Sequence, residues 1–316
     1  MKRFIAIWVS LLFVVGLVSG VFGQDLKMIL ATGGTAGTYY PFGGVLAKIW
    51  NSKVPGVNVT AQATGASAEN VRLINKKEVE LALVQSDTID FAYHAKEAFK
   101  ERLTKMNAVA VLYPEIIQIV VRGDSKIRSF VDLKGVKIGV GAPGSGTEAN
   151  FRQLLEAHGM KKEDVRAQYL SFAESAEQFK DRHIDAFIVV AGIPNAAIMD
   201  VAVMQSIRIL SLPDDRVAHL IRKYSFLSPA VVPPNTYKNQ PSGVKTVAVS
   251  AVLIVSSDLK EEVVLKLTRA LFENQAELAA AHAKGKELHL KTAMKGVSIP
   301  FHPGAIKYYK EQGVMK

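Results

Sequence analysis

The chain contains no cysteine among its 316 residues. This absence excludes disulfide bridges, thiolate metal sites, cysteine nucleophiles and attachment of a lipid through an N-terminal cysteine. Hydrophobic residues make up 49% and charged residues 22% of the chain, which is typical of a globular protein with a substantial core. The length is enough for two domains of roughly 130 to 150 residues each.

Long apolar runs are absent after the first 23 residues. That first segment places Lys2 and Arg3 before an uncharged stretch that ends at Gly23, which is the pattern of a secretory signal peptide. An uncleaved single anchor of about 20 residues would have the same pattern. We expect residues 1–23 to be a signal peptide and the protein to be exported to the periplasm.

The sequence also lacks any arginine-rich run, although its net charge is +10. The basic residues are scattered over amphipathic segments and are not interleaved with aromatic residues along a strand. Such scatter is typical of a solvated basic surface. We therefore predict no nucleic-acid partner.

Enzyme and cofactor motifs are incomplete or missing. Gly139, Gly141 and Gly144 satisfy G-x-G-x-x-G, but the next predicted strand ends without the acidic residue that would hold a ribose. Ser145 stands where a Walker loop needs lysine, and neither H-E-x-x-H nor G-x-S-x-G occurs. The seven histidines lack the close spacing of metal ligands. We predict a protein that is not an enzyme and that holds no cofactor or metal.

Apolar periodicity predicts alternating strands and helices in two blocks. Short buried strands between helices indicate parallel pairing and an α/β fold. The first block has strands at 26–32, 57–64 and 79–85 with helices at 41–51 and 67–76; the second has strands at 136–142, 167–172 and 184–190 with helices at 147–157 and 174–182.

Two long β-branched runs, 113–124 and 246–259, bracket the second block. They would carry the chain from one lobe to the other and back. A long amphipathic helix is predicted after the return, at 258–282. We therefore predict lobe I at 24–116 plus 253–316, and lobe II at 117–252.

Glycine is concentrated in the stretch ATGGTAGTYYPFGG, residues 31–44, between a predicted strand and a predicted helix. Glycines let backbone N–H groups approach a guest, and a helix N-terminus favours a carboxylate or phosphate. Thr35 and Tyr39 add hydroxyl groups. An ordinary strand-to-helix turn is the alternative interpretation.

Three further polar turns follow predicted strands: TGASAEN at 64–70, VQSDT at 84–88 and GAPGSGTEAN at 141–150. Loops at the carboxyl ends of parallel strands converge on one crevice. Helix capping alone would explain Ser67, Asp87 and Thr147 individually. The recurrence of the pattern in both blocks predicts a cleft between two lobes that holds a small polar ligand.

These motifs, together with AVSAVLIVSSDL at 248–259, resemble the TAXI class of TRAP-transporter solute-binding receptors over nearly the whole chain after residue 23. The resemblance implies a two-lobed type II periplasmic binding-protein fold with the ligand cleft between the lobes. It implies a small carboxylate as the ligand, such as glutamate, glutamine or 2-oxoglutarate, and delivery to a TRAP-type membrane permease.

The resemblance also assigns ligand-binding residues. The dicarboxylate branch of these receptors pairs an arginine with the ligand, but no arginine falls within these motifs, so we expect backbone N–H groups and hydroxyls to hold the carboxylate. The predicted contacts are Thr35, Gly37, Tyr39, Ala66, Ser67, Asn70, Gln85 and Asp87 from the first lobe, and Ser145, Gly146, Thr147, Gly192 and Pro194 from the second.

Two other classes of function stay open. A secreted enzyme acting on a small organic acid could use Asp87, Tyr39 or a histidine as acid or base, although the sequence shows no nucleophile and base pair. A surface adhesin would be expected to show internal repeats, and none is found.

Overall fold

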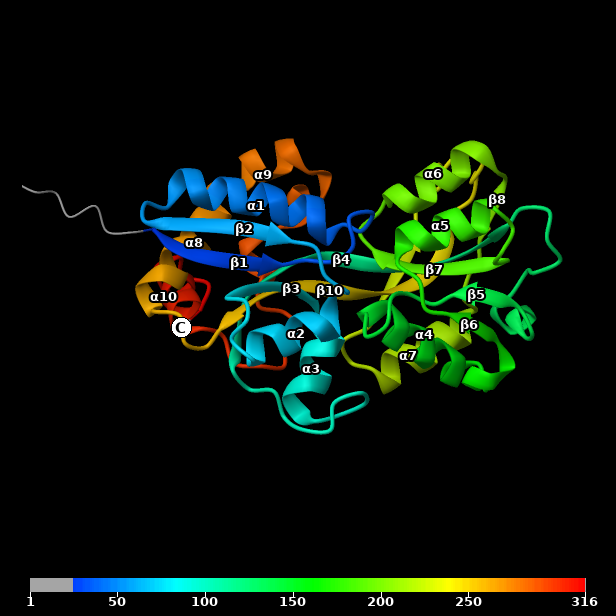
Figure 1. The fold of residues 1–316 in the computed structure, drawn as a ribbon, viewed down its shortest axis with the longest axis horizontal. Coiled ribbons are helices and arrows are strands. Elements are labelled where there is room, and N and C mark those ends of the chain that lie inside the picture. Colours follow the sequence, from blue (N-terminus) through cyan, green and yellow to red (C-terminus); the bar gives the residue numbers. More distant parts are fainter. Residues whose placement is uncertain (1–24, 316) are drawn as a thin grey trace, which may run out of the picture.

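Ten strands form one continuous sheet in the computed structural model, which describes residues 25–315 (Figure 1). The predicted signal peptide lies outside the described residues. Within 25–315, no helix combines the length and apolar character needed to cross a membrane. The strands are β1 (Leu26–Ala31), β2 (Val57–Gln62), β3 (Leu81–Gln85), β4 (Met106–Arg122), β5 (Lys137–Gly139), β6 (Arg166–Gln168), β7 (Ala186–Ala191), β8 (Ile207–Ile209), β9 (Ser228–Val232) and β10 (Val244–Ser256).

The sheet runs in the order β2-β1-β3-β10-β4-β7-β5-β6, with β8 beside β4 and β9 beside β10. At one end β1 pairs in parallel with β2 and β3, and at the other end β5 pairs in parallel with β6 and β7. The prediction of parallel pairing within each block is therefore confirmed. Between the two parallel groups, β10 and β4 are antiparallel to each other and to their neighbours.

The strands β4 and β10 connect the two lobes (Figure 1). From Met106 to Ile116, β4 pairs with β10, and from Ile116 onward it pairs with β7 and β8. In β10, the first residues pair with β9 and the last residues pair with β3. The predicted lobe boundaries at 116 and 252 fall inside these two strands. The two-lobed α/β architecture is as predicted.

Helices cover both faces of the sheet in each lobe. The strand β3 shows why: Leu81 and Leu83 join the core beneath α1, α8 and α10, while Ala82 and Val84 join the core beneath α2 and α3. Successive side chains of a strand point to opposite faces, so the run of four apolar residues that begins β3 needs a cover on both sides. The helices are α1 (Tyr39–Lys53), α2 (Ser67–Asn75), α3 (Ser86–His94), α4 (Gly146–Ala157), α5 (Phe172–Lys180), α6 (Ala196–Met204), α7 (Asp214–Lys223), α8 (Glu261–Glu273), α9 (Gln275–Ala281) and α10 (Pro303–Glu311).

The second lobe repeats this arrangement on β7. Ile188 packs with α4 and α7, whereas Phe187 and Val189 pack with α5 and α6 on the opposite face. Four short 3₁₀ helices complete the described elements: η1 (Phe130–Leu133), η2 (Lys162–Asp164), η3 (Ala283–Glu287) and η4 (Leu290–Thr292).

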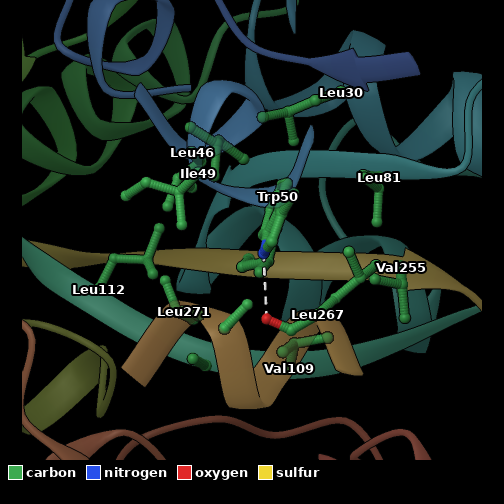
Figure 2. Close-up of a cluster of buried hydrophobic side chains, with 14 of the residues drawn as sticks. Leu30, Leu46, Ile49, Trp50, Leu81, Val109, Leu112, Val255, Leu267 and Leu271 are labelled. Carbon is green, nitrogen blue, oxygen red and sulfur yellow. Dashed lines mark hydrogen bonds between the residues drawn. The ribbon is translucent and has the colours of Figure 1, made fainter. Parts of the chain in front are cut away.

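Trp50 fixes α1 to the C-terminal helices (Figure 2). Its ring is fully buried among Leu46, Leu271 and neighbouring aliphatic side chains, and its Nε1 donates a hydrogen bond to the carbonyl oxygen of Leu267 at 3.0 Å. Because this oxygen belongs to α8, the bond joins two helices whose sequences lie more than 200 residues apart. The bond and the packing of the ring fix α1, which begins at the glycine-rich loop, against α8.

The predicted long helix at 258–282 is wrong, because the structure breaks it into α8 and α9 at Asn274. Asn274 has φ −109° and ψ 24°, and its side chain donates to the carbonyl oxygen of Ala270. Asparagine competes for backbone hydrogen bonds in this way, which disfavours it within helices. The predicted strand at 167–172 is also too long, since Ser171 caps α5, which begins at Phe172.

Replacing Trp50 by alanine should lower the free energy of unfolding by about 3–5 kcal/mol, because it leaves a cavity in the first-lobe core and removes the hydrogen bond to Leu267. Urea unfolding followed by circular dichroism measures the change. Val131→Ala, at a side chain that is 52% exposed, is the control and should shift stability by less than about 0.5 kcal/mol. A loss below about 1 kcal/mol for Trp50→Ala would contradict this account of α1.

Candidate functional site

A cavity of about 320 Å³ lies between the lobes, where loops that follow strands of both lobes meet. Its volume is at the lower end of the range for small-molecule sites. The lining comes from both parallel groups of strands and from β4. It comprises residues 33–39, 63–67, Gln85, Glu115, Ala142, 145–147, 171–173, Val190 and Ala191.

Most of the predicted contact residues lie on this cavity. Nine of the thirteen line it: Thr35, Gly37, Tyr39, Ala66, Ser67, Gln85, Ser145, Gly146 and Thr147. The other four, Asn70, Asp87, Gly192 and Pro194, are not among the lining residues. Contact with a ligand stays a prediction for all thirteen.

Five helices begin at the cavity. Their first residues or N-cap residues line it: Tyr39 of α1, Ser67 of α2, Gln85 before α3, Gly146 of α4 and Phe172 of α5. Three of these helices belong to the first lobe and two to the second. Helix N-termini carry unpaired N–H groups and partial positive charge, so their convergence makes the cavity favourable for an anion.

The two lobes cap these helices differently. The N-cap residues of α1, α2 and α3 accept no hydrogen bond through their side chains. In α4 and α5, Ser145 accepts from the backbone of Glu148, and Ser171 accepts from that of Glu174. Capping therefore explains Ser145 in part. In the first lobe, other groups accept from some of the first N–H groups: the N–H of Ala68 donates to the carbonyl oxygen of Gly144, and that of Thr88 donates to Asp87.

The backbone around the cavity departs from ordinary conformations. Ala66, the residue before α2, has φ 75°, which is costly for a residue with a side chain. Gly141 has φ 96°, and a Cβ atom there would lie 2.6 Å from the Oγ of Ser145. Such strain is common at binding sites, because it places N–H groups where regular structure would not.

Glu115 is a lining residue that sequence reasoning missed. It lies in β4, is 2% exposed, and its Oε2 accepts a hydrogen bond from the hydroxyl group of Tyr39 at 2.6 Å. Burial raises the pKa of Glu115 to about 8, although the Tyr39 hydrogen bond acts in the opposite direction; Asp87 raises this pKa further. The available signal was the one acidic residue in a strand that is mostly apolar.

Gln85 lies beside this carboxyl group at the end of β3. It lines the cavity and is 2% exposed, and its Oε1 has no hydrogen-bond partner among the described residues. The same oxygen lies directly against Gly146 of the second lobe, where a Cβ atom would overlap it. A buried acceptor without a partner is costly and indicates a donor supplied from outside the chain.

Asp87 joins the two lobes beneath the cavity. Its Oδ2 accepts hydrogen bonds from the side chain of Asn150 at 2.7 Å and from that of Gln153 at 3.4 Å, and both donors belong to α4. Burial raises the pKa of Asp87 to about 6, partly offset by these hydrogen bonds and by one from the backbone N–H of Thr88. Asp87 is thus an interlobe contact.

Asn70 holds the first lobe together below the cavity. Its Nδ2 donates to the carbonyl oxygens of Thr32 at 2.6 Å and Leu83 at 2.8 Å, and its Oδ1 accepts from the hydroxyl group of Thr64. The side chain therefore links β1, β3 and the loop before α2. Asn70 was predicted to contact a ligand, but in the structure its side chain bonds the chain itself and does not line the cavity.

Gly192 and Pro194 lie in the loop that follows β7. The carbonyl oxygen of Gly192 accepts from the hydroxyl group of Thr38 at 3.5 Å, and the peptide bond before Pro194 is cis. Asn195 caps α6 and donates to the carbonyl oxygen of Ala36 at 3.2 Å. This loop contacts the glycine-rich segment from outside the cavity.

No lysine, arginine or histidine is among the residues that line the cavity. Over residues 25–315, no group of three or more histidine, aspartate or glutamate side chains is placed to hold a metal ion. An anion in the cavity would therefore depend on backbone N–H groups and hydroxyls, whose hydrogen bonds to a charged acceptor are strong.

The model of the NMT1-like family matches residues 30–313, and the chain belongs to this family. The fold is similar to that of a periplasmic transporter (TM-score 0.58, 11% identity), with 92% of this chain and 93% of that one covered. It is also similar to a Streptococcus mutans structure concerned with glutathione import through GshT and the cystine ABC importer TcyBC (TM-score 0.54, 16% identity, 84% and 98% covered). A third similar structure is the alkanesulfonate-binding protein SsuA of Xanthomonas axonopodis pv. citri bound to MOPS (TM-score 0.51, 15% identity, 92% and 91% covered). The fold is that of the periplasmic binding proteins.

Asn70→Ala should lower the free energy of unfolding by about 1–3 kcal/mol, because it removes the buried hydrogen bonds that the side chain donates to the carbonyl oxygens of Thr32 and Leu83. Chemical unfolding measures this loss. Asn58→Ala, on the exposed edge of β2, should change stability by less than about 0.5 kcal/mol. Equal stabilities of the two variants would show that the Asn70 bonds contribute nothing.

Glu115 should make the protein less stable as pH rises. Its pKa is about 8 in the folded chain and near 4.5 when unfolded, so the folded state holds the extra proton between these values. Stability from this group is complete below pH 4.5 and falls by roughly 3–5 kcal/mol as pH rises to 8. Glu115→Gln should remove this fall, as measured by urea unfolding at pH 5 and pH 8.

The control for this measurement is Glu101→Gln, at an exposed glutamate. It should leave the difference in unfolding free energy between pH 5 and pH 8 as in the unsubstituted protein. If Glu115→Gln also leaves that difference unchanged, the carboxyl group of Glu115 is ionised in the folded chain at neutral pH.

Proposed function

We propose that the protein is an extracytoplasmic solute receptor that binds a small carboxylate and delivers it to a TRAP-type membrane permease. The observation that carries this proposal is the convergence of five helix N-termini from both lobes on one cavity. A carboxylate placed there accepts hydrogen bonds from both lobes, which stabilises the closed arrangement relative to an open one.

Existing contacts between the lobes support closure around the ligand. The backbone N–H of Ala68 donates to the carbonyl oxygen of Gly144 at 3.1 Å, and Asp87 contacts α4. The crossing strands β4 and β10 are the segments about which the lobes would move. With few direct bonds between the lobes, a ligand that contacts both supplies much of the free energy of closure.

The proposal of a TRAP-type permease is based on the sequence motifs. They resemble TAXI receptors of TRAP transporters, whereas the Streptococcus mutans neighbour serves an ABC importer. The sulfonate and glutathione ligands named for the similar proteins are small charged organic solutes, in keeping with an anion at the helix N-termini. Uptake that stops when ion gradients are collapsed, with ATP maintained, distinguishes the TRAP partner from an ABC partner.

An enzyme acting on a small organic acid remains the second function to test. Of the acid and base candidates that the sequence suggested, Tyr39 lines the cavity, and Asp87 and the histidines do not. Mass spectrometry of any bound acid after prolonged incubation reports turnover directly.

Calorimetry against amino acids, 2-oxo acids and dicarboxylic acids should give a dissociation constant in the micromolar range or below for at least one of them. Gly146→Ala should weaken that binding by about 1–3 kcal/mol, because a Cβ atom would overlap the Oε1 of Gln85 and force it or α4 away. The matched control is Gly44→Ala, where a Cβ atom meets nothing within 4 Å. No binding of any organic acid, or equal binding by both variants and the unsubstituted protein, would contradict the proposal.

A further inference from the structure

One side of the cavity wall is apolar, and the second lobe supplies it. The apolar side chains come from the loop after β5, the start of α5 and the end of β7. They belong to Ala142, Phe172, Ala173, Val190 and Ala191. Val190 and Ala191 are 3% and 1% exposed, so the end of β7 is enclosed. Enclosed apolar side chains form no hydrogen bond with a ligand and favour an apolar group against them.

Phe172 is the largest apolar side chain on this side of the wall. It is the first residue of α5, and it packs against the same second-lobe core as Ala36 of the glycine-rich segment. A Cβ atom placed on Gly37 would lie 3.8 Å from the ring of Phe172, so the ring also reaches the first lobe. Phe172 and Ala36 therefore extend the apolar side across the gap between the lobes.

The polar side of the wall offers neutral donors. Tyr39 donates its hydroxyl proton to Glu115 at 2.6 Å, and Thr64 donates its own to the Oδ1 of Asn70 at 2.7 Å. A hydroxyl group has one proton, so neither can donate to a ligand while these bonds persist. The donors that remain for a ligand are chiefly backbone N–H groups at the starts of helices.

The charges on the wall disfavour a ligand with two carboxylates. Lysine, arginine and histidine are absent from the lining residues, whereas the carboxyl group of Glu115 is among them. Burial raises the pKa of Glu115 to about 8, although its hydrogen bond from Tyr39 acts in the opposite direction. The cavity thus already disfavours the charged form of its own acid. A second ligand carboxylate would add a like charge with no cation to balance it.

We propose that the receptor takes a monocarboxylate with an apolar chain in preference to the dicarboxylate of the same carbon number. This inference rests on the proposed function, because the helix N-termini are taken to bind the ligand's carboxylate. The remainder of the ligand then lies against Phe172 and Val190. A methyl group there leaves water for an apolar wall, whereas a second carboxylate would lose its hydration without a compensating partner.

Calorimetry of the unsubstituted protein at pH 7 tests this preference with three pairs of five-carbon acids. The pairs are pentanoate and glutarate, 2-oxopentanoate and 2-oxoglutarate, and L-norvaline and L-glutamate. Within each pair only the far end differs, a methyl group in one acid and a carboxylate in the other. We expect the monocarboxylate to bind at least tenfold more tightly in every pair that binds. Shortening the better chain by one methylene group should weaken binding about fourfold.

Phe172→Ala removes the largest apolar surface from the wall. It should weaken binding of the best monocarboxylate at least tenfold and change the affinity for its dicarboxylate by less than about threefold. The matched control is Tyr169→Ala, at an aromatic residue of the same lobe that is 38% exposed and does not line the cavity. It should leave every affinity unchanged. If Phe172→Ala does not fold, the three pairs measured on the unsubstituted protein still decide.

A smaller preference than tenfold, or a preference for the dicarboxylate, overturns this inference and leaves the proposed receptor function standing. A folded Phe172→Ala variant that keeps the affinity for the monocarboxylate does the same. Absence of binding by these six acids and by every other organic acid overturns both. The two failures are therefore distinguishable within one set of titrations.

Discussion

The antiparallel pairing of β4 with β10 is the constraint on which the site depends. These two strands are long enough to belong to both lobes, so they set where the parallel strands of each lobe end relative to those of the other. Because the helices that follow those strands begin at the cavity, their N-terminal N–H groups meet across one space. Neither lobe alone would enclose it.

The sequence was sufficient to predict much of this arrangement. Short apolar strands that alternate with helices predicted two α/β lobes, and the polar turns that follow those strands supplied the nine predicted residues that line the cavity. What periodicity cannot reveal is where a helix is interrupted without glycine or proline, as at Asn274. Periodicity also cannot distinguish an asparagine side chain that faces a ligand from one that forms hydrogen bonds with the protein's own backbone. Asn70 stands at the right point in a turn, but its side chain is directed at two carbonyl groups.

Glu115 was missed for a different physical reason. Within a strand, sequence alone gives no sign of whether a lone acid faces water, a salt-bridge partner or a cavity, since this depends on which residues fold over it. In the structure Tyr39, from a helix 76 residues earlier, covers it and donates to it. The resulting wall combines a buried carboxyl group, an amide and hydroxyl groups, and no lysine, arginine or histidine lines it. In the proposed receptor, backbone N–H groups that the fold holds in place would bind the carboxylate of the ligand.

The position of β10 between β3 and β4 also constrains the order of assembly. The first lobe contains the earliest strands, but its sheet lacks a central member until the residues after 243 have been made. The second lobe is an uninterrupted insertion and has most of its strands before that point. As the polypeptide emerges from the ribosome, the lobe that starts first is therefore the one that is completed last, and closing a loop of about 170 residues between β3 and β10 is the slow, entropically costly event. Until then, β3 and β4 each lack the neighbour that β10 provides in the folded sheet.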